Sequence, residues 1–184
     1  MGQRKTPPKA KLIIGILLRN ALDFEPICRR LTEKFGPIDE ILAPFSFVAT
    51  NFYADELGEK PWRAFVAFDC LVARDELAAA KIWTQGLERE GITQGLRSYN
   101  LDPGIVTLGQ LFLATTKDQR QRVYVGEGIY IEPTLYFQNH DWRPFEWTYK
   151  DYRDGDYFGF LKAVREKLHL MLKVQGVEAR PLET

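Results

Sequence analysis

Leu12-Ile-Ile-Gly-Ile-Leu-Leu18 is the stretch that decides the fold, because it is a short apolar run without polar alternation. Such a run is typical of a central strand covered on both faces. The next segment predicts a helix packed on this strand, with Asp23 placed to cap its start and Gly36-Pro37 to end it. Its apolar residues recur at steps of three and four: Phe24, Ile27, Cys28, Leu31 and Phe35.

Three further strands and a second helix are predicted along the next part of the chain. Residues 38–48 and 62–71 are rich in aromatic and aliphatic side chains and predict two strands around a long polar loop over 51–60. Residues 75–90 have the helical period, and 96–101 predict a fourth strand. The order βαββαβ is the split arrangement of ferredoxin-like domains, with both helices on one face of an antiparallel sheet. We therefore predict an α+β fold with a ferredoxin-like core and a mainly antiparallel sheet.

The rest of the chain predicts an extension of this core. It comprises a short helix near 107–113, a β-hairpin over 122–137 and a C-terminal helix for which Asp154 is available as a cap. No linker rich in glycine, proline or serine divides the chain. We expect one domain over 11–176, between a flexible N-terminus over 1–10 and a tail over 177–184.

Composition limits the classes of partner. Twenty-five basic and twenty-five acidic residues cancel and are interspersed, so nucleic acid is not an expected partner. Cys28 and Cys70 form no CxxC motif, and we interpret them as small buried hydrophobes in a reducing compartment. The apolar run 12–18 is too short for a signal sequence or a membrane span. We expect a cytoplasmic protein with no membrane partner.

The predicted hairpin is the most site-like stretch of the chain. If Gly126-Glu127-Gly128 is a three-residue loop, Val125 faces Ile129, Tyr124 faces Tyr130, and Arg122 faces Glu132. A two-residue loop would place Val125 opposite Tyr130 and mix the apolar and polar faces. The Arg122–Glu132 pair has two interpretations, an ordinary cross-strand ion pair or part of a binding site.

Other polar residues favour the interpretation of the Arg122–Glu132 pair as part of a binding site. Leu101-Asp-Pro-Gly104 predicts a turn that exposes Asp102, and Thr115 and Lys117 precede the hairpin. If the hairpin joins the sheet beside that turn, these side chains converge on one cleft. Hydroxyl, ammonium and guanidinium groups beside two carboxylates suit a phosphate-bearing ligand or a metal-assisted hydrolysis. The candidate ligand-binding residues are Asp102, Thr115, Lys117, Arg122, Tyr124, Tyr130 and Glu132.

Seven motifs follow one another along the chain: Lys11-Leu-Ile-Ile-Gly15, Phe35-Gly-Pro-Ile-Asp39, Asn100-Leu-Asp-Pro-Gly104, Leu113-Ala-Thr-Thr-Lys-Asp118, Arg122-Val-Tyr-Val-Gly126, Gly128-Ile-Tyr-Ile-Glu132 and Trp147-Thr-Tyr-Lys-Asp-Tyr-Arg153. Together they resemble an uncharacterised bacterial family catalogued as a domain of unknown function. The resemblance implies no activity, ligand or catalytic residue. Members are sometimes labelled GTP-binding, but the chain has no GxxxxGK[ST] loop, and Thr116-Lys-Asp118 is at most a distorted fragment of a base-reading motif. Pro133 replaces a family Ala-Glu-Val pattern and suggests an edge position or a bulge.

Three other features have simple interpretations. Ala64-Phe-Val-Ala-Phe68 matches only the second half of an RNA-binding motif, and core packing explains it. His140 and His169 have no second ligand at helical spacing, so no histidine metal site is predicted. The aromatic and basic segment 147–153 is either a loop that plugs the edge of the core or a lid over the cleft.

We expect the cleft to bind a small anionic, nucleotide-like ligand. Arg122 and Lys117 would hold the anion, while Glu132 and Asp102 would take a metal or ligand hydroxyls. One alternative is a metal-assisted hydrolase that uses Asp102 and Glu132, and another is a non-catalytic adaptor or RNA-binding module. The sequence identifies no cofactor and leaves open whether the protein is an enzyme.

Overall fold

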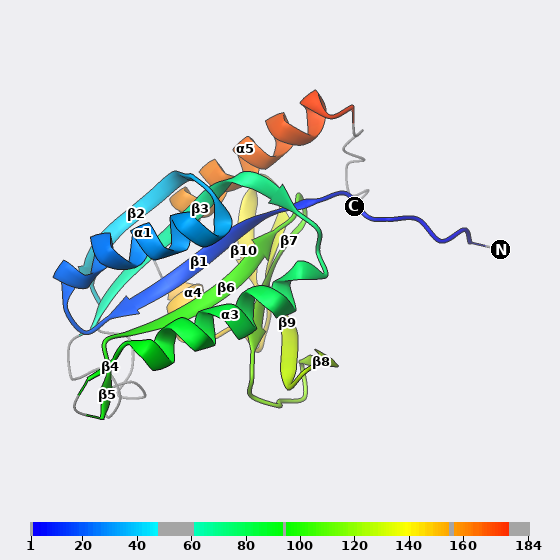
Figure 1. Cartoon of the computed structure of the whole chain (residues 1–184). Helices are drawn as coiled ribbons and strands as arrows, with labels where there is room; N and C mark the ends of the chain where they lie inside the picture. The colour runs from blue at the N-terminus through cyan, green and yellow to red at the C-terminus, as the bar shows by residue number, and fades with distance from the viewer. Residues whose placement is uncertain (1, 48–60, 94, 155–156, 177–184) are drawn as a thin grey trace.

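The computed structural model describes residues 2–47, 61–93, 95–154 and 157–176. One open sheet carries α1 and α3 on one face and α5 on the other (Figure 1). The helices are η1 (Ala21–Asp23), α1 (Phe24–Phe35), α3 (Glu76–Glu90), α4 (Lys150–Asp154) and α5 (Phe158–Val174). The strands are β1 (Ala10–Leu18), β2 (Ile38–Ser46), β3 (Trp62–Val72), β4 (Ile92–Thr93), β5 (Leu96–Arg97), β6 (Tyr99–Val106), β7 (Gln110–Thr115), β8 (Val123–Gly126), β9 (Ile129–Gln138) and β10 (Asp141–Pro144).

Strand β1 lies at the centre of the molecule, and all nine of its residues are buried. Because successive side chains of a strand point to opposite faces, β1 contributes to two cores. Leu12, Ile14 and Ile16 pack with α1 and α3, whereas Ile13 packs in the cluster that contains α5. The expected central strand covered on both faces is confirmed.

The strand order is β10-β9-β7-β6-β1-β3-β2, with β8 paired to β9. Every strand pair is antiparallel, which confirms the predicted α+β class and the mainly antiparallel sheet. Within this sheet, the order β6-β1-β3-β2 with α1 and α3 on one face is compatible with a ferredoxin-like core.

The predicted first helix is present, but its start differs from the prediction. Asp23 stands at the N-cap of α1 and makes no side-chain capping hydrogen bond. Asn20 instead accepts a hydrogen bond from the Leu22 amide at 3.0 Å and caps η1, the short helix before α1. At the other end, Gly36 has a φ of 92°, a left-handed conformation that ends the helix as expected. The predicted loop over 51–60 lies outside the described residues.

Two predictions next to the core are wrong. The segment Leu101–Gly104 is not a turn, because it lies inside β6 and pairs with β1. Pro103 is tolerated there because the ladder to β7 begins only at Gly104. The helix near 107–113 is also absent, since Thr107 closes a tight turn by accepting hydrogen bonds from Gly109 and Gln110. The short apolar run that follows forms β7, a pattern that periodicity alone does not separate from a helix.

The hairpin has the predicted tyrosine pair and a different loop. Tyr124 opposes Tyr130, and their ring centroids are 5.2 Å apart. Glu127 and Gly128, with φ values of 51° and 75°, form a two-residue loop. Gly126 therefore opposes Ile129, and the expected Val125–Ile129 pair is wrong because Val125 is the extra residue of a bulge. The bulge keeps the tyrosines opposed despite the shorter loop.

A second bulge confirms the expectation for Pro133. Phe112 pairs with Pro133 and Leu111 pairs with Leu135, which leaves Thr134 as the extra residue of β9. The carbonyl groups freed here are used by the following segment. Trp147 Nε1 donates to the Pro133 carbonyl at 2.9 Å, and Thr148 Oγ1 donates to the Thr134 carbonyl at 2.6 Å.

The C-terminal helix packs the apolar stripe that the sequence predicts. Leu161, Val164 and Leu168 are fully buried against the face of the sheet opposite α1 and α3. The predicted cap is wrong, because Asp154 belongs to α4 and Tyr157 stands at the N-cap of α5. Cys28 and Cys70 are both unpaired thiols packed at the edge of a core, and burial raises the pKa of Cys28 to about 11.

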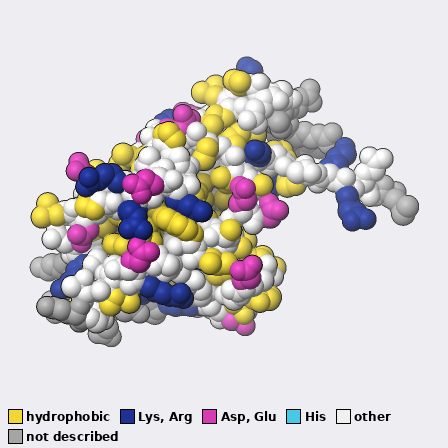
Figure 2. Space-filling view, in the orientation of Figure 1, with side chains coloured by type: hydrophobic (Ala, Val, Ile, Leu, Met, Phe, Trp, Pro, Cys, Tyr) yellow, Lys and Arg dark blue, Asp and Glu magenta, His cyan; other side chains and the backbone are white. Residues whose placement is uncertain are grey.

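The surface over α1 and α3 carries basic and acidic side chains in close alternation (Figure 2). This distribution matches the zero net charge of the sequence. Within the described residues, none of the helices is both long enough and apolar enough to span a bilayer. Phe65 and Phe68, the aromatics of the partial RNA-binding motif, are fully buried in β3 and present no stacking surface.

Two glycines provide a matched test of the packing where β6 meets β7. A Cβ at Gly104 would lie 2.8 Å from the Phe112 carbonyl oxygen, whereas a Cβ at Gly86 in α3 meets nothing within 4 Å. We expect Gly104→Ala to lower the free energy of unfolding by about 1–3 kcal/mol, because the backbone must shift. Gly86→Ala should raise it by about 0.5–1 kcal/mol through helix propensity. Urea unfolding measures both, and equal effects of the two substitutions would contradict the described packing.

Candidate functional site

A cavity of about 350 Å³ lies where β6 and β7 separate. The two strands pair only from Gly104 to Val106 of β6, and both contribute residues beyond that ladder to the cavity wall. The remaining wall comes from α3, the segment before the hairpin, β9 and α4. The sequence-predicted residues that line it are Asp102, Thr115, Lys117, Arg122 and Glu132. Tyr124 and Tyr130 are not among the lining residues.

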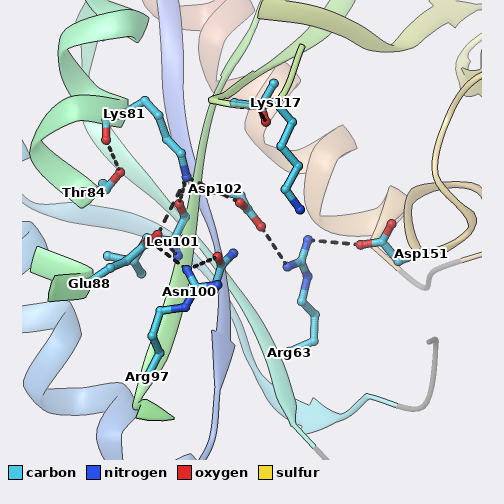
Figure 3. Close-up of polar contacts among 11 residues, drawn as sticks. Arg63, Lys81, Thr84, Glu88, Arg97, Asn100, Leu101, Asp102, Lys117 and Asp151 are labelled. Carbon is cyan, nitrogen blue, oxygen red and sulfur yellow. Dashed lines mark hydrogen bonds and ion pairs between the residues drawn. The ribbon is translucent and has the colours of Figure 1, made fainter. Parts of the chain in front are cut away.

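Arg63 of β3 is the most deeply buried charge beside the cavity, with 1% of its side chain exposed. Its Nη1 atom lies 3.6 Å from Asp102 Oδ2, and its Nη2 atom lies 3.5 Å from Asp151 Oδ2 (Figure 3). The guanidinium also lies 4.6 Å from the ring centroid of Phe65. Burial alone would lower the pKa of Arg63, but Tyr152, Asp151 and Asp102 raise it on balance. Arg63 therefore stays charged and links two acidic lining residues from different elements.

A second group of charges extends from Asp102 toward α3. Lys81 Nζ lies 3.7 Å from Asp102 Oδ1 and 3.7 Å from Glu88 Oε1, and it donates to the Leu101 carbonyl at 2.7 Å. Glu88 accepts from the Leu101 amide at 2.7 Å and lies 3.3 Å from Arg97 Nη1. Burial raises the pKa of Glu88, and Lys81 opposes that shift. Figure 3 shows these groups on the side of Asp102 opposite Arg63.

The Arg122–Glu132 contact predicted from the hairpin is present. Arg122 Nε donates to Glu132 Oε2 at 2.8 Å, and the two side chains are 3% and 5% exposed. The other arms of the guanidinium donate to the Lys117 carbonyl at 2.7 Å and to the Tyr149 hydroxyl at 3.1 Å. This is a buried, hydrogen-bonded pair, which differs from an ordinary ion pair on an exposed surface.

The segment before α5 contributes to the cavity and to the core. Tyr149 and Lys150 line the cavity, whereas Tyr152 is only 3% exposed and also packs in the core that contains α5. Burial raises the pKa of the Tyr152 phenol well above its ordinary value, so the hydroxyl keeps its proton. This position agrees with the predicted aromatic plug for Tyr152.

Sequence reasoning did not identify Arg63, Lys81, Glu88, Asn100 and Asp151 as members of this site. A signal for two of them exists in α3, where the buried residues Leu77, Lys81, Thr84 and Glu88 recur at steps of four and three. Charged residues on the apolar stripe of a helix indicate buried ion pairs. Asp151 has no such local signal, because its partner Arg63 is 88 residues away in sequence.

The cavity is lined by charged side chains of both signs. The lining includes the basic residues Lys81, Arg97, Lys117, Arg122 and Lys150 and the acidic residues Glu88, Asp102, Glu132 and Asp151. Arg63, buried behind Asp102 and Asp151, adds a further positive charge. Among the described residues, no group of three histidine, cysteine, aspartate or glutamate side chains is placed to hold a metal ion.

A family model described as Domain of unknown function (DUF4416) matches residues 8–168. The matched range contains every described element from β1 to most of α5, and all the residues that line the cavity. This match confirms the resemblance seen in the sequence motifs. No curated protein and no solved structure matches the chain.

The buried charge of Arg63 can be tested against an exposed counterpart. Arg63→Met leaves Asp102 and Asp151 without their shared cation, so we expect the free energy of unfolding to fall by about 3 kcal/mol. Arg30 and Glu90 form an ion pair on the surface, and Arg30→Met should have a much smaller effect. Urea denaturation of both variants measures the difference. If the two variants lose similar amounts of unfolding free energy, the buried ion pairs of Arg63 do not stabilise the fold more than a surface pair does.

The shifted pKa of Asp151 leads to a prediction of how the free energy of unfolding depends on pH. Burial raises the pKa of Asp151 above its ordinary value of 3.8, and Arg63 only partly reverses this shift. The folded state therefore binds the proton more tightly than the unfolded state, and the stability contributed below pH 3.8 is lost as the pH rises through the folded pKa. We expect the free energy of unfolding of the parent, minus that of Asp151→Asn, to fall as the pH rises from about 3 to 6. A difference that rises with pH would mean that Arg63 depresses the pKa instead.

Proposed function

We propose that this chain, which belongs to the family described as Domain of unknown function (DUF4416), binds a small anionic ligand in the cavity beside β6. The observation that carries the proposal is the cavity lining, in which basic side chains outnumber acidic ones and Arg63 lies directly behind. Charged groups removed from bulk water attract an opposite charge more strongly than the same groups on an open surface. An anion therefore complements this cavity.

Lys117 and Arg122 supply the cationic groups nearest the hairpin. Figure 3 shows the Lys117 side chain extending toward Asp102 and Arg63, on the side of Asp102 away from Lys81. Arg122 makes three hydrogen bonds to Glu132, Lys117 and Tyr149. A guanidinium has five N–H groups, so two remain for a ligand while the described contacts hold its orientation.

The size of the cavity favours a small ligand over a polymer. At about 350 Å³ it lies near the lower end of the range for small-molecule sites. An adaptor surface would instead be a broad, exposed apolar patch. A nucleotide-like ligand remains the finer form of the proposal, with phosphate groups at the Lys117 and Arg122 end.

The geometry gives less support to metal-assisted hydrolysis by Asp102 and Glu132. Glu132 Oε2 accepts hydrogen bonds from Arg122 at 2.8 Å and from Gln121 at 3.2 Å. Asp102 faces the separate cations Arg63 and Lys81. Each carboxylate is thus directed toward positive charge, an arrangement that opposes a shared divalent cation.

Binding can be tested by thermal shift and calorimetry with inorganic phosphate, pyrophosphate and nucleotides as probes. We expect at least one of these anions to raise the unfolding midpoint, because a ligand that binds only the folded state stabilises it. Lys117→Gln should weaken that binding by about tenfold through loss of a charge-assisted contact.

The matched control is Lys173→Gln, which removes the same charge from the exposed surface of α5 outside the cavity. Its affinity should equal that of the parent. If no anion shifts the midpoint, or if both variants lose affinity equally, the proposed site is wrong.

A further inference from the structure

We infer that the ligand carries hydroxyl groups beside its anionic group, as a sugar or polyol phosphate does, and that Asp102, Asn100 and Tyr152 form the subsite for those hydroxyls. This inference rests on the proposed anion binding and specifies its ligand class. Three observations lead to it. Among the described residues, one acidic side chain makes no hydrogen bond and two buried donors have no acceptor, and the strand register brings these groups together.

Asp102 differs from the other acidic residues of the cavity. Its two oxygens lie 3.6 Å from Arg63 Nη1 and 3.7 Å from Lys81 Nζ, too far for hydrogen bonds. The side chain is 26% exposed and lines the cavity. By contrast, Glu88 accepts from the Leu101 amide at 2.7 Å and Glu132 accepts from Arg122 at 2.8 Å. Within the described part of the chain, Asp102 is an acceptor held near two cations with its lone pairs still available.

The two donors are buried and also line the cavity. Asn100 is 7% exposed, and its Oδ1 atom accepts from Arg97 Nη1 at 3.2 Å, which directs the Nδ2 group elsewhere. That Nδ2 group has no partner among the described residues, and neither has the Tyr152 hydroxyl. A buried polar group without a partner costs free energy, so such groups mark places where a bound molecule completes the hydrogen bonding.

The sheet brings these groups together. Asn100 and Asp102 are two residues apart on β6 and therefore point to the same face. Asp102 is the register partner of Gly15 on β1. A Cβ on Gly15 would lie 3.2 Å from the Tyr152 hydroxyl and 3.2 Å from Arg63 Nη2. The missing side chain at Gly15 thus lets the Tyr152 hydroxyl lie over the sheet beside Asp102.

A hydroxyl group is the ligand group that matches this arrangement. An ionised aspartate only accepts hydrogen bonds, an amide NH₂ only donates, and a hydroxyl does both. A carboxylate has no proton to give Asp102, and both a carboxylate and a phosphate are repelled by the negative charge of that side chain. An ammonium group can donate to Asp102 but cannot accept from Asn100. Lys117 and Arg122, which also line the cavity, suit a phosphate, which has up to two negative charges and several acceptor oxygens.

Isothermal titration calorimetry with matched compounds tests the ligand class. Ribose 5-phosphate and glycerol 3-phosphate represent hydroxylated phosphates, whereas propyl phosphate and inorganic phosphate have no hydroxyl group on carbon. Ribose lacks the anion, and gluconate replaces phosphate by a carboxylate. We expect at least one hydroxylated phosphate to bind about tenfold more tightly than propyl phosphate, because two otherwise unpaired groups gain partners.

Two variants separate the hydroxyl subsite from general damage. Asp102→Asn should remove the preference for hydroxylated phosphates while inorganic phosphate binds as tightly as before or more tightly, since a negative charge is lost. Tyr152→Phe should also weaken binding of the hydroxylated phosphates severalfold. Its unfolding midpoint should nevertheless equal or exceed that of the parent, because the deleted hydroxyl has no partner among the described residues. A loss of affinity for every anion together with a lower midpoint would indicate structural damage and overturn the assignment.

The outcomes also separate this inference from the proposed function. If inorganic phosphate, propyl phosphate and the hydroxylated phosphates bind equally, anion binding stands and the hydroxyl subsite is wrong. Stronger binding of gluconate than of any phosphate would overturn the phosphate assignment. If none of the compounds binds, the proposed function fails and this inference fails with it.

Discussion

The guanidinium of Arg63 is the constraint around which the rest of the site is arranged. A full charge with 1% exposure has lost most of its hydration, and this cost must be offset inside the protein. Asp102 on β6 and Asp151 on α4 supply the opposite charge, and the ring of Phe65 covers the guanidinium. One side chain thereby links three elements that are distant in sequence. It joins α4 to the sheet through Asp151, beside the cavity.

The other wall depends on where the sheet stops pairing. β6 and β7 share a short ladder that ends at Gly104, and the strands then separate. Because β6 and β7 are apart beyond Gly104, Lys81 of α3 reaches the Leu101 carbonyl and Asp102. The segment before the hairpin also lines the space between the strands. At the bulge in β9, Trp147 and Thr148 donate hydrogen bonds to the carbonyl groups of Pro133 and Thr134, so these carbonyls need no strand partner. A cavity forms at a sheet position that would otherwise be filled by a continuous ladder.

Patterns of short range could be predicted from the sequence, and contacts of long range could not. The apolar run of β1, the helical period of α3 and the opposition of Tyr124 to Tyr130 all depend on neighbours within one or two elements. The Asp-Pro-Gly segment looks like a turn, yet pairing with β1 overrides that local preference. The same limit applies to the site. Arg122 and Glu132 are ten residues apart and predictable, whereas Arg63 and Asp151 are 88 apart and meet only through the fold.

The long ion pairs around Asp102 have a consequence for recognition. Arg63 and Lys81 each lie between two carboxylates at 3.5–3.7 Å, whereas a direct charge-assisted hydrogen bond is about 2.7–2.9 Å long. A cation shared in this way neutralises charge without saturating the lone pairs of either partner. Among the described residues, the carboxylate of Asp102 is therefore held near two cations while its acceptors remain open. A site built this way separates charge neutralisation from hydrogen bonding, so it can select for hydroxyl groups next to an anion instead of binding any anion equally.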